Sequence, residues 1–160
     1  MDYLWTPWRY QYVTTGELPS GCVFCAAAAG GDDRANLIVH RASRNFIILN
    51  RFPYTNGHVM VVPFQHVSRL EDLAEEALLE MMRLARDCEK HLRATYRPDG
   101  LNIGMNLGRS AGAGVAGHVH MHILPRWAGD TNFMTTVAET RVLPEDLAST
   151  WKRLREALAV

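Results

Sequence analysis

The chain has 160 residues, of which 48% are hydrophobic, so it is long enough to bury a core within one domain. Seventeen basic side chains balance seventeen acidic ones, which argues against nucleic acid or a membrane surface as partner. The apolar runs are too short to cross a bilayer, and the N-terminus lacks the pattern of a signal peptide. Three cysteines without a secretory signal indicate a reducing compartment. We therefore expect a cytoplasmic protein.

The first half of the chain predicts an N-terminal arm followed by strands. Residues 1–20 are aromatic and irregular, and their large rings are expected to pack on the body or on a partner subunit. The small residues Ala26 to Gly31 predict a turn or a short helix. Runs rich in Ile, Val and Phe, each bounded by turn residues, then predict three strands, Leu37 to Arg41, Asn45 to Asn50 and His58 to Pro63.

A long helix is predicted next. Ser68 and Glu71 have the spacing of a capping box at its start. The apolar residues that follow recur at helical spacing: Leu70, Leu73, Ala77, Met81, Ala85, Cys88 and Leu92. Cys88 therefore belongs to the buried face of this helix.

After the helix, a turn at Pro98 leads into a fourth strand, Leu101 to Leu107, and a glycine-rich loop then leads to a fifth. Pro144 is predicted as the first residue of a C-terminal helix. Its apolar face would carry Leu147, Trp151, Leu154 and Leu158. The order of strands, long helix, strands and helix favours an α+β domain with an antiparallel sheet.

Three histidines alternate in the predicted fifth strand, at His118, His120 and His122. Successive strand side chains point to opposite faces, so all three imidazoles are expected on one face. A neutral imidazole is a nucleophile, and it can also carry a proton. The strand begins twelve residues after Asn106, at the end of a glycine-rich approach. The pattern favours an active site over its alternatives, a metal site or a histidine-rich strand without chemistry.

The glycine-rich loop from Gly108 to Gly117 is a second candidate for chemistry. Glycines let backbone N–H groups converge on an anion, although this loop matches neither a Walker motif nor a dinucleotide fingerprint. Asn106 could add an amide donor, or it could simply end the preceding strand.

Cys22 and Cys25 have the spacing of half a zinc knuckle. The chain contains no second cysteine pair, so any further ligands would have to be histidines. The spacing alone leaves open which histidines these are, and whether a metal binds at all.

Together these motifs resemble the signature of the histidine triad (HIT) nucleotide-binding superfamily. The segment from Asn50 to Pro63 is similar to the family's upstream sheet motif, with Asn50 and His58 eight residues apart. The likeness spans roughly Cys22 to Arg126, and residues 4–12 and 127–133 resemble the bacterial diadenosine tetraphosphate phosphorylase branch. It implies a five-stranded antiparallel sheet with one long helix and a C-terminal helix. The expected organisation is an arm (1–20), a HIT core (22–126) and a C-terminal extension with a helix (127–160).

The resemblance also implies a role for each site residue. His120 would attack the α-phosphate of a nucleotide and form a covalent nucleotidyl-imidazole. His118 completes the triad, and His58 would support it from the neighbouring strand. The remaining residues would bind the nucleotide: phosphate at His122, Asn106 and the backbone of Gly112, Gly114 and Val115, ribose at Asn50, and base at Ile48 and Met60.

In zinc-containing relatives, the cysteine pair is completed by two histidines. The matching positions here are His66 and His118, so the implied ligands are Cys22, Cys25, His66 and His118. Four protein ligands leave no open position, which makes the implied zinc structural.

The implied activity is nucleotidyl transfer or hydrolysis on dinucleoside polyphosphates, most closely diadenosine tetraphosphate phosphorylase of the ATP adenylyltransferase type. Many HIT hydrolases have Gln or Ser where this chain has Gly114. Trp127 could exclude water from the phosphate end of the site, so both residues favour inorganic phosphate as acceptor. The alternatives are a hydrolase of dinucleoside polyphosphates or phosphoramidates, and a non-catalytic nucleotide-binding regulatory module. Relatives form two-fold dimers, so a homodimer is expected.

Overall fold

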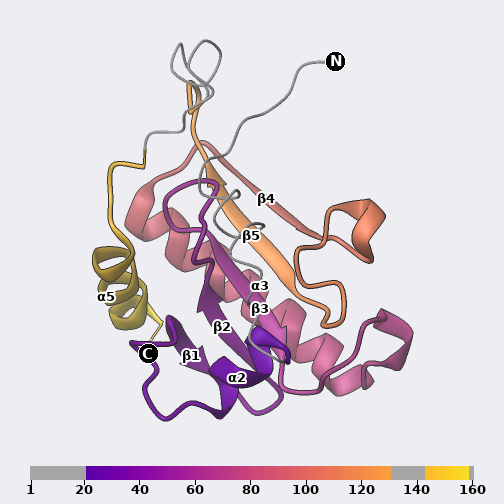
Figure 1. Cartoon of the computed structure of the whole chain (residues 1–160). Helices are drawn as coiled ribbons and strands as arrows, with labels where there is room; N and C mark the ends of the chain where they lie inside the picture. Colours follow the sequence, from indigo (N-terminus) through magenta and orange to yellow (C-terminus); the bar gives the residue numbers. More distant parts are fainter. Residues whose placement is uncertain (1–20, 131–142, 159–160) are drawn as a thin grey trace, which may run out of the picture.

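The computed structural model describes residues 21–130 and 143–158, and the aromatic arm predicted at residues 1–20 lies outside these ranges. Five strands form one antiparallel sheet in the order β1-β2-β3-β5-β4 (Figure 1). The strands are β1 (Ile38–Arg41), β2 (Asn45–Leu49), β3 (Val59–Pro63), β4 (Gly100–Met105) and β5 (Met121–Arg126). The helices are α2 (Val23–Ala29), α3 (Glu75–Tyr96) and α5 (Leu147–Ala157), with 3₁₀ turns η1 (Leu70–Asp72) and η2 (Arg109–Ala111). The predicted α+β fold, with one long helix and a C-terminal helix, is confirmed.

The two faces of the sheet carry separate apolar clusters. Alternate residues of β2 and β3 point to opposite faces, and all of them are buried. One face packs against α3 and α5, and Figure 1 shows α5 beside the β1 edge. On the other face lies the α2-side cluster, which consists of Phe24, Ala27, Ile38, Phe46, Ile48, Met60 and Val62. The short helix α2 therefore covers the face of the sheet opposite to the long helix.

The strand that carries the histidines is shorter than predicted. β5 begins at Met121, so only His122 of the triad lies in regular strand. Continuing the β3–β5 register beyond Val61 and Met121 would pair Pro63 with Val119, but proline has no N–H for the ladder. The N–H of Val119 instead donates to the Val67 carbonyl at 2.8 Å. The segment 118–120 therefore lies outside the ladder.

Both predicted helix starts were wrong in detail. Ser68 does not cap α3, because Leu70–Asp72 forms a separate 3₁₀ turn and the chain is extended at Leu73, which is buried in the core. The helix then begins at Glu75 without a side-chain cap, although acidic residues in its first turn suit the helix dipole. α5 begins at Leu147 rather than Pro144, because the Asp146 carboxylate accepts the Ser149 N–H at 2.9 Å.

The predicted apolar faces of the two helices agree with the structure, except that Leu70 and Leu73 precede α3, in the η1 turn and just after it. The buried residues of α3 include Ala77, Met81, Ala85, Cys88 and Leu92, and Leu147, Trp151, Leu154 and Leu158 of the C-terminal segment pack on the same core. Among the described residues, no helix is both long enough and apolar enough to cross a membrane.

Glu80 of α3 ties the long helix to the β1–β2 turn. Its carboxylate accepts the backbone N–H groups of Ser43 and Arg44, at 3.2 and 2.8 Å, and the Asn45 amide at 2.8 Å. Burial opposes the charged form of Glu80, but these hydrogen bonds outweigh it and lower its pKa. A carboxyl whose folded pKa lies below its unfolded pKa stabilises the protein above the unfolded value, and this stabilisation is lost as pH falls.

We expect Glu80→Gln to lower the free energy of unfolding by about 1–2 kcal/mol at pH 7, since charge-assisted hydrogen bonds are replaced by weaker ones. The difference from wild type should shrink below the ordinary Glu pKa of about 4.3. Urea unfolding at several pH values measures this. The matched control is Glu89→Gln on the same helix. Glu89 forms a surface ion pair with Arg93, and its substitution should change the free energy of unfolding by less than about 0.5 kcal/mol. A pH-independent loss would contradict the assignment.

Candidate active site and metal cluster

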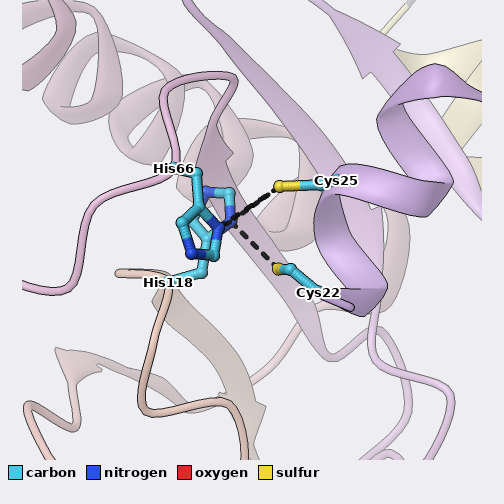
Figure 2. Close-up of side chains that lie close together, drawn as sticks. All are labelled: Cys22, Cys25, His66 and His118. Atoms are coloured by element: carbon cyan, nitrogen blue, oxygen red, sulfur yellow. Dashed lines mark hydrogen bonds between the residues drawn. The ribbon is translucent and has the colours of Figure 1, made fainter. Parts of the chain in front are cut away.

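Four side chains from three segments meet at one end of the sheet. Cys22 and Cys25 come from the start of α2, His66 from the loop after β3, and His118 from the segment before β5; Figure 2 shows both imidazoles facing the two thiols. His118 Nδ1 lies 3.2 Å from Cys22 Sγ, 3.6 Å from Cys25 Sγ and 3.2 Å from His66 Nδ1. Cys25 Sγ lies 3.3 Å from His66 Nδ1. The structure thus brings together all four residues implied by the resemblance.

The donor set of this cluster fits a tetrahedral metal. The Pro63 carbonyl lies 2.9 Å from His118 Nε2. A carbonyl can only accept, so the proton sits on Nε2 and Nδ1 presents a lone pair to the cluster. Around zinc, with bonds of about 2.0–2.3 Å, neighbouring N and S ligands stand roughly 3.3–3.8 Å apart. The four potential ligand atoms lie within 4.8 Å of one another, so this cluster can hold a metal.

The end of α2 opposite the cysteines is fixed to the sheet by Arg41 of β1. Its guanidinium donates to the carbonyls of Ala28 and Gly30, at 2.7 and 3.2 Å, and to the Asp33 carboxylate at 2.8 Å. These bonds satisfy carbonyls at the C-terminus of the helix. The cluster at one end and Arg41 at the other therefore hold α2 against the sheet.

His120 follows the cluster residue His118 by two positions, and its ring is buried. Its Nδ1 lies 2.8 Å from the His118 carbonyl, so Nδ1 is the protonated nitrogen and Nε2 keeps a lone pair. Burial lowers the pKa of His120, although its hydrogen bond to the carbonyl works in the opposite direction. The ring is therefore neutral near pH 7. Its neighbours are the rings of Phe24, at 5.0 Å, and His122, at 4.9 Å between centroids.

His58 and His122 are hydrogen-bonded to each other, and this bond gives His122 the tautomer opposite to that of His120. The backbone N–H of Tyr54 donates to His58 Nδ1 at 3.2 Å, so the proton of neutral His58 sits on Nε2. His58 Nε2 lies 2.9 Å from His122 Nδ1 and donates to it. Burial and the neighbouring His122 and His120 lower the pKa of His58 to about 3, and burial and His120 lower that of His122 to about 4. Both rings stay neutral, and His122 carries its proton on Nε2.

The structure therefore places two neighbouring imidazoles in opposite tautomers. His120 offers a lone pair at Nε2, whereas His122 offers an N–H at its own Nε2. A nucleophile beside a neutral hydrogen-bond donor suits attack on a centre that carries negatively charged oxygens.

The sequence and structure match one known family. The model of the HIT domain family matches residues 33–129. The chain belongs to the HIT domain family. It is 37% identical over 161 residues to the AP-4-A phosphorylase of Mycobacterium tuberculosis, an alignment that covers 96% of this chain and 83% of that protein.

Solved structures of HIT proteins share the fold. A Zn-bound histidine triad family protein from Mycobacterium smegmatis has a TM-score of 0.71 and 31% identity, and the match covers 87% of this chain and 94% of that one. A hypothetical histidine triad nucleotide-binding protein from Sulfolobus tokodaii has a TM-score of 0.68 and 27% identity, covering 86% and 92% of the two chains. The similarity thus includes a HIT protein with bound zinc.

The residues expected at the base lie in one row across the sheet with His122, the last histidine of the triad. Strand register places Ile48 opposite Met60, Met60 opposite His122 and His122 opposite Gly104, and residues directly opposite share a face of the sheet. Ile48 and Met60 are only 7% and 6% exposed, because they belong to the α2-side cluster with Phe24. A Cβ at Gly104 would meet no heavy atom within 4 Å, so the sheet beside His122 is open on the β4 side.

Asn50, expected at the ribose, lies at the end of β2 next to His58. Its amide oxygen accepts the Phe52 N–H at 3.0 Å, and its amide nitrogen lies 3.3 Å from His58 Nδ1. Asn50 therefore shapes the loop that holds His58, and each of its amide atoms retains one further hydrogen-bonding position.

The glycine-rich loop brings further donors toward the triad. Gly112 has a positive φ of 89°, which favours glycine, and a Cβ there would lie 3.8 Å from the Asn106 amide nitrogen. Asn106 is the first residue after β4 and Val115 packs on the α2-side cluster, so the loop folds back over that face. A Cβ at Gly114 would meet no heavy atom within 4 Å.

Trp127 follows β5 and lines a hollow of about 360 Å³ together with Tyr54, Asn56 and Tyr96. The triad histidines are not among the described residues that line this hollow. Tyr54 lies between the two sites, because its ring centroid is 4.9 Å from that of His58 and 6.3 Å from that of His122. The turn that carries Trp127 is fixed by the Arg126–Asp130 ion pair.

Sequence reasoning missed three residues that hold this site. Phe24 contacts both His118 and His120, Tyr54 sets the tautomer of His58, and Arg41 anchors α2. Phe24 lies between the two cysteines and Tyr54 lies inside the upstream motif, so the sequence indicated both segments but not the roles of these two residues. Arg41 carries no local signal, since its partners lie 11 and 13 residues away.

Proposed function

We propose that this HIT protein is a nucleotidyltransferase that cleaves dinucleoside polyphosphates with inorganic phosphate, by way of a covalent nucleotidyl-histidine at His120. The opposite tautomers of His120 and His122 carry this proposal, since they pair a nucleophilic nitrogen with a neutral donor. The relative that is named AP-4-A phosphorylase supports the choice of diadenosine tetraphosphate as substrate.

In the first step, the lone pair of His120 Nε2 forms a bond to the α-phosphorus. The P–O bond to the rest of the substrate breaks, and its electron pair leaves with ATP. The His120 ring then carries a positive charge, which the His118 carbonyl stabilises through the hydrogen bond from Nδ1. The N–H of His122 faces the charge that develops on the phosphoryl oxygens, where a preorganised donor contributes most to the rate.

In the second step, an oxygen of inorganic phosphate bonds to the same phosphorus. The N–P bond breaks and its electron pair returns to His120 Nε2, which restores the nucleophile and releases ADP. Asn106 and the backbone of Gly112, Gly114 and Val115 supply further donors for phosphate oxygens. Asn50 hydrogen-bonds the ribose, and Ile48 and Met60 contact the edge of the base. His58 keeps His122 in the donor tautomer throughout, because its low pKa keeps it neutral.

Cys22, Cys25, His66 and His118 would hold a zinc ion outside the reaction itself. When bound, zinc supplies a cross-link between α2, the loop after β3 and the segment before β5. The chemistry at phosphorus needs no metal in this scheme, since neutral donors face the phosphate.

Product analysis with diadenosine tetraphosphate tests the proposal. With phosphate we expect equal amounts of ATP and ADP, and without phosphate we expect turnover to fall at least tenfold. ¹⁸O-labelled phosphate should place its label in ADP. Gly114 favours this outcome, since glycine offers no side chain that could activate water.

Three other outcomes would contradict the proposal. Equal rates with and without phosphate, giving AMP and ATP, would indicate a hydrolase. Faster turnover of adenosine monophosphoramidate than of the dinucleotide would indicate a phosphoramidase. Tight nucleotide binding without any turnover would indicate a regulatory binding module.

A further inference from the structure

We infer that the metal cluster positions the nucleophile, in addition to cross-linking the fold. The inference rests on the proposed role of His120. His118 belongs to the cluster through its side chain and accepts the His120 Nδ1–H through its backbone carbonyl, at 2.8 Å. His118 is therefore both a potential metal ligand and the acceptor of the hydrogen bond that fixes the tautomer of His120.

This connection matters because His118 lacks the support of the sheet. β5 begins only at Met121, and the His118 N–H makes a long 3.4 Å bond to the Val115 carbonyl. The side chain supplies two further anchors, with Nε2 bonded to the Pro63 carbonyl at 2.9 Å and Nδ1 directed into the cluster. The His118 carbonyl shares a planar peptide group with the Val119 N–H, which donates to the Val67 carbonyl at 2.8 Å. Val67 directly follows the cluster residue His66. The direction of the His118 carbonyl therefore depends on two cluster residues, on His118 through its own imidazole and on His66 through the position of Val67.

Phe24 provides a second, independent connection. It lies between Cys22 and Cys25 on α2, is 5% exposed, and sits edge-on to His118 with ring centroids 5.6 Å apart. The same ring lies against His120 at 5.0 Å. The cysteines hold the start of α2, so they also hold the apolar wall that limits rotation of the His120 ring.

Loss of one cluster ligand should loosen both connections. The His118 ring would keep its bond to the Pro63 carbonyl but lose its place in the cluster. The segment of His66 and Val67, which accepts the Val119 N–H, could then shift, and the His118 carbonyl could turn away from His120. His120 could then place its proton on Nε2, and this tautomer has no lone pair there to attack phosphorus. We therefore expect a lower kcat with little change in KM, because substrate-binding groups stay in place while the nucleophile is misaligned.

His66 is the most suitable ligand to change, because it is the exposed member of the cluster. His66→Ala should lose zinc, lower kcat at least roughly tenfold and leave KM within about twofold. Long-range ¹H–¹⁵N correlation spectra should show His120 changing from the Nδ1–H to the Nε2–H tautomer. His66→Cys keeps a ligand at this position and should restore zinc, kcat and the tautomer. His91→Ala, on α3 outside the cluster, is the matched control.

Zinc removal from the wild-type protein by a chelator, followed by zinc addition, gives the same comparison without a mutation. A metal-free protein that stays folded, with unchanged kcat and His120 as Nδ1–H, would overturn the inference. The tautomer is measured without substrate, so it tests the coupling even if the protein proves not to be a phosphorylase. Failure of the proposed function would instead appear as a product pattern other than ATP and ADP in the wild type.

Discussion

His120→Ala is expected to lower kcat for diadenosine tetraphosphate by about 10⁴-fold or more, because it removes the atom that forms the covalent bond. Nucleotide affinity should change little, since the proposed binding groups at Asn50, Asn106 and His122 remain. The fold should persist as well, because the buried His120 ring packs against Phe24 on the α2 side of the sheet rather than in the core beneath α3. Steady-state kinetics and calorimetric titration with a non-hydrolysable analogue measure the two effects separately.

The covalent step has its own readout. Denaturing mass spectrometry of quenched wild-type reactions should find an adenylyl group on the peptide that contains His120, and the variant should lack it. His91→Ala provides a histidine control that should keep both the adduct and the rate. Turnover in His120→Ala within tenfold of wild type, or an adduct on another residue, would rule out His120 as the nucleophile.

Much of this fold could be predicted because its signals are local. β2 and β3 are short apolar runs between turn residues, and the face of α3 follows from apolar residues at helical spacing. Asn50 and His58 are brought together by one hairpin, so their eight-residue spacing already indicates proximity. These features depend on neighbours in the sequence, which is why periodicity revealed them.

The structure differs from the sequence-based predictions where residues distant in the sequence determine the local conformation. The histidine segment leaves the ladder because Pro63 cannot donate to it, and Pro63 lies 55 residues before His118. α3 begins late because Leu73 reaches the core in an extended conformation. No pattern within either segment shows these effects.

The metal cluster illustrates the same limit. The spacing of Cys22 and Cys25 indicated two ligands, but left seven histidines in the chain as candidates for the others. Family resemblance selected His66 and His118, and the structure places their Nδ1 atoms 3.2 Å apart. The physical reason is the antiparallel β3–β5 pairing, which brings the end of β3 and the start of β5 together beside α2. Tertiary pairing, rather than spacing, thus completes the set.

Zinc is expected to copurify at about one ion per chain, and its loss should lower the midpoint of thermal unfolding by roughly 10 °C. Structural zinc contributes on the order of 10 kcal/mol in small peptides that cannot fold without it. Here two apolar clusters pack on the sheet independently of the metal, so we expect a smaller contribution of about 3–4 kcal/mol, equivalent to about 10 °C at this size. Metal analysis and thermal melts with and without a chelator measure both quantities.

A pair of cysteine variants separates zinc binding from general packing. In the double variant Cys22→Ser and Cys25→Ser, zinc should be absent and the melting midpoint should no longer respond to the chelator. Cys88→Ser is the matched control, since this thiol is 2% exposed on α3, within the core and outside the cluster. It should also lower stability, because it buries a hydroxyl, yet it should keep its zinc and its response to the chelator. Wild-type protein purified without chelators and found to contain no zinc would refute the prediction, as would a double variant that still responds to the chelator.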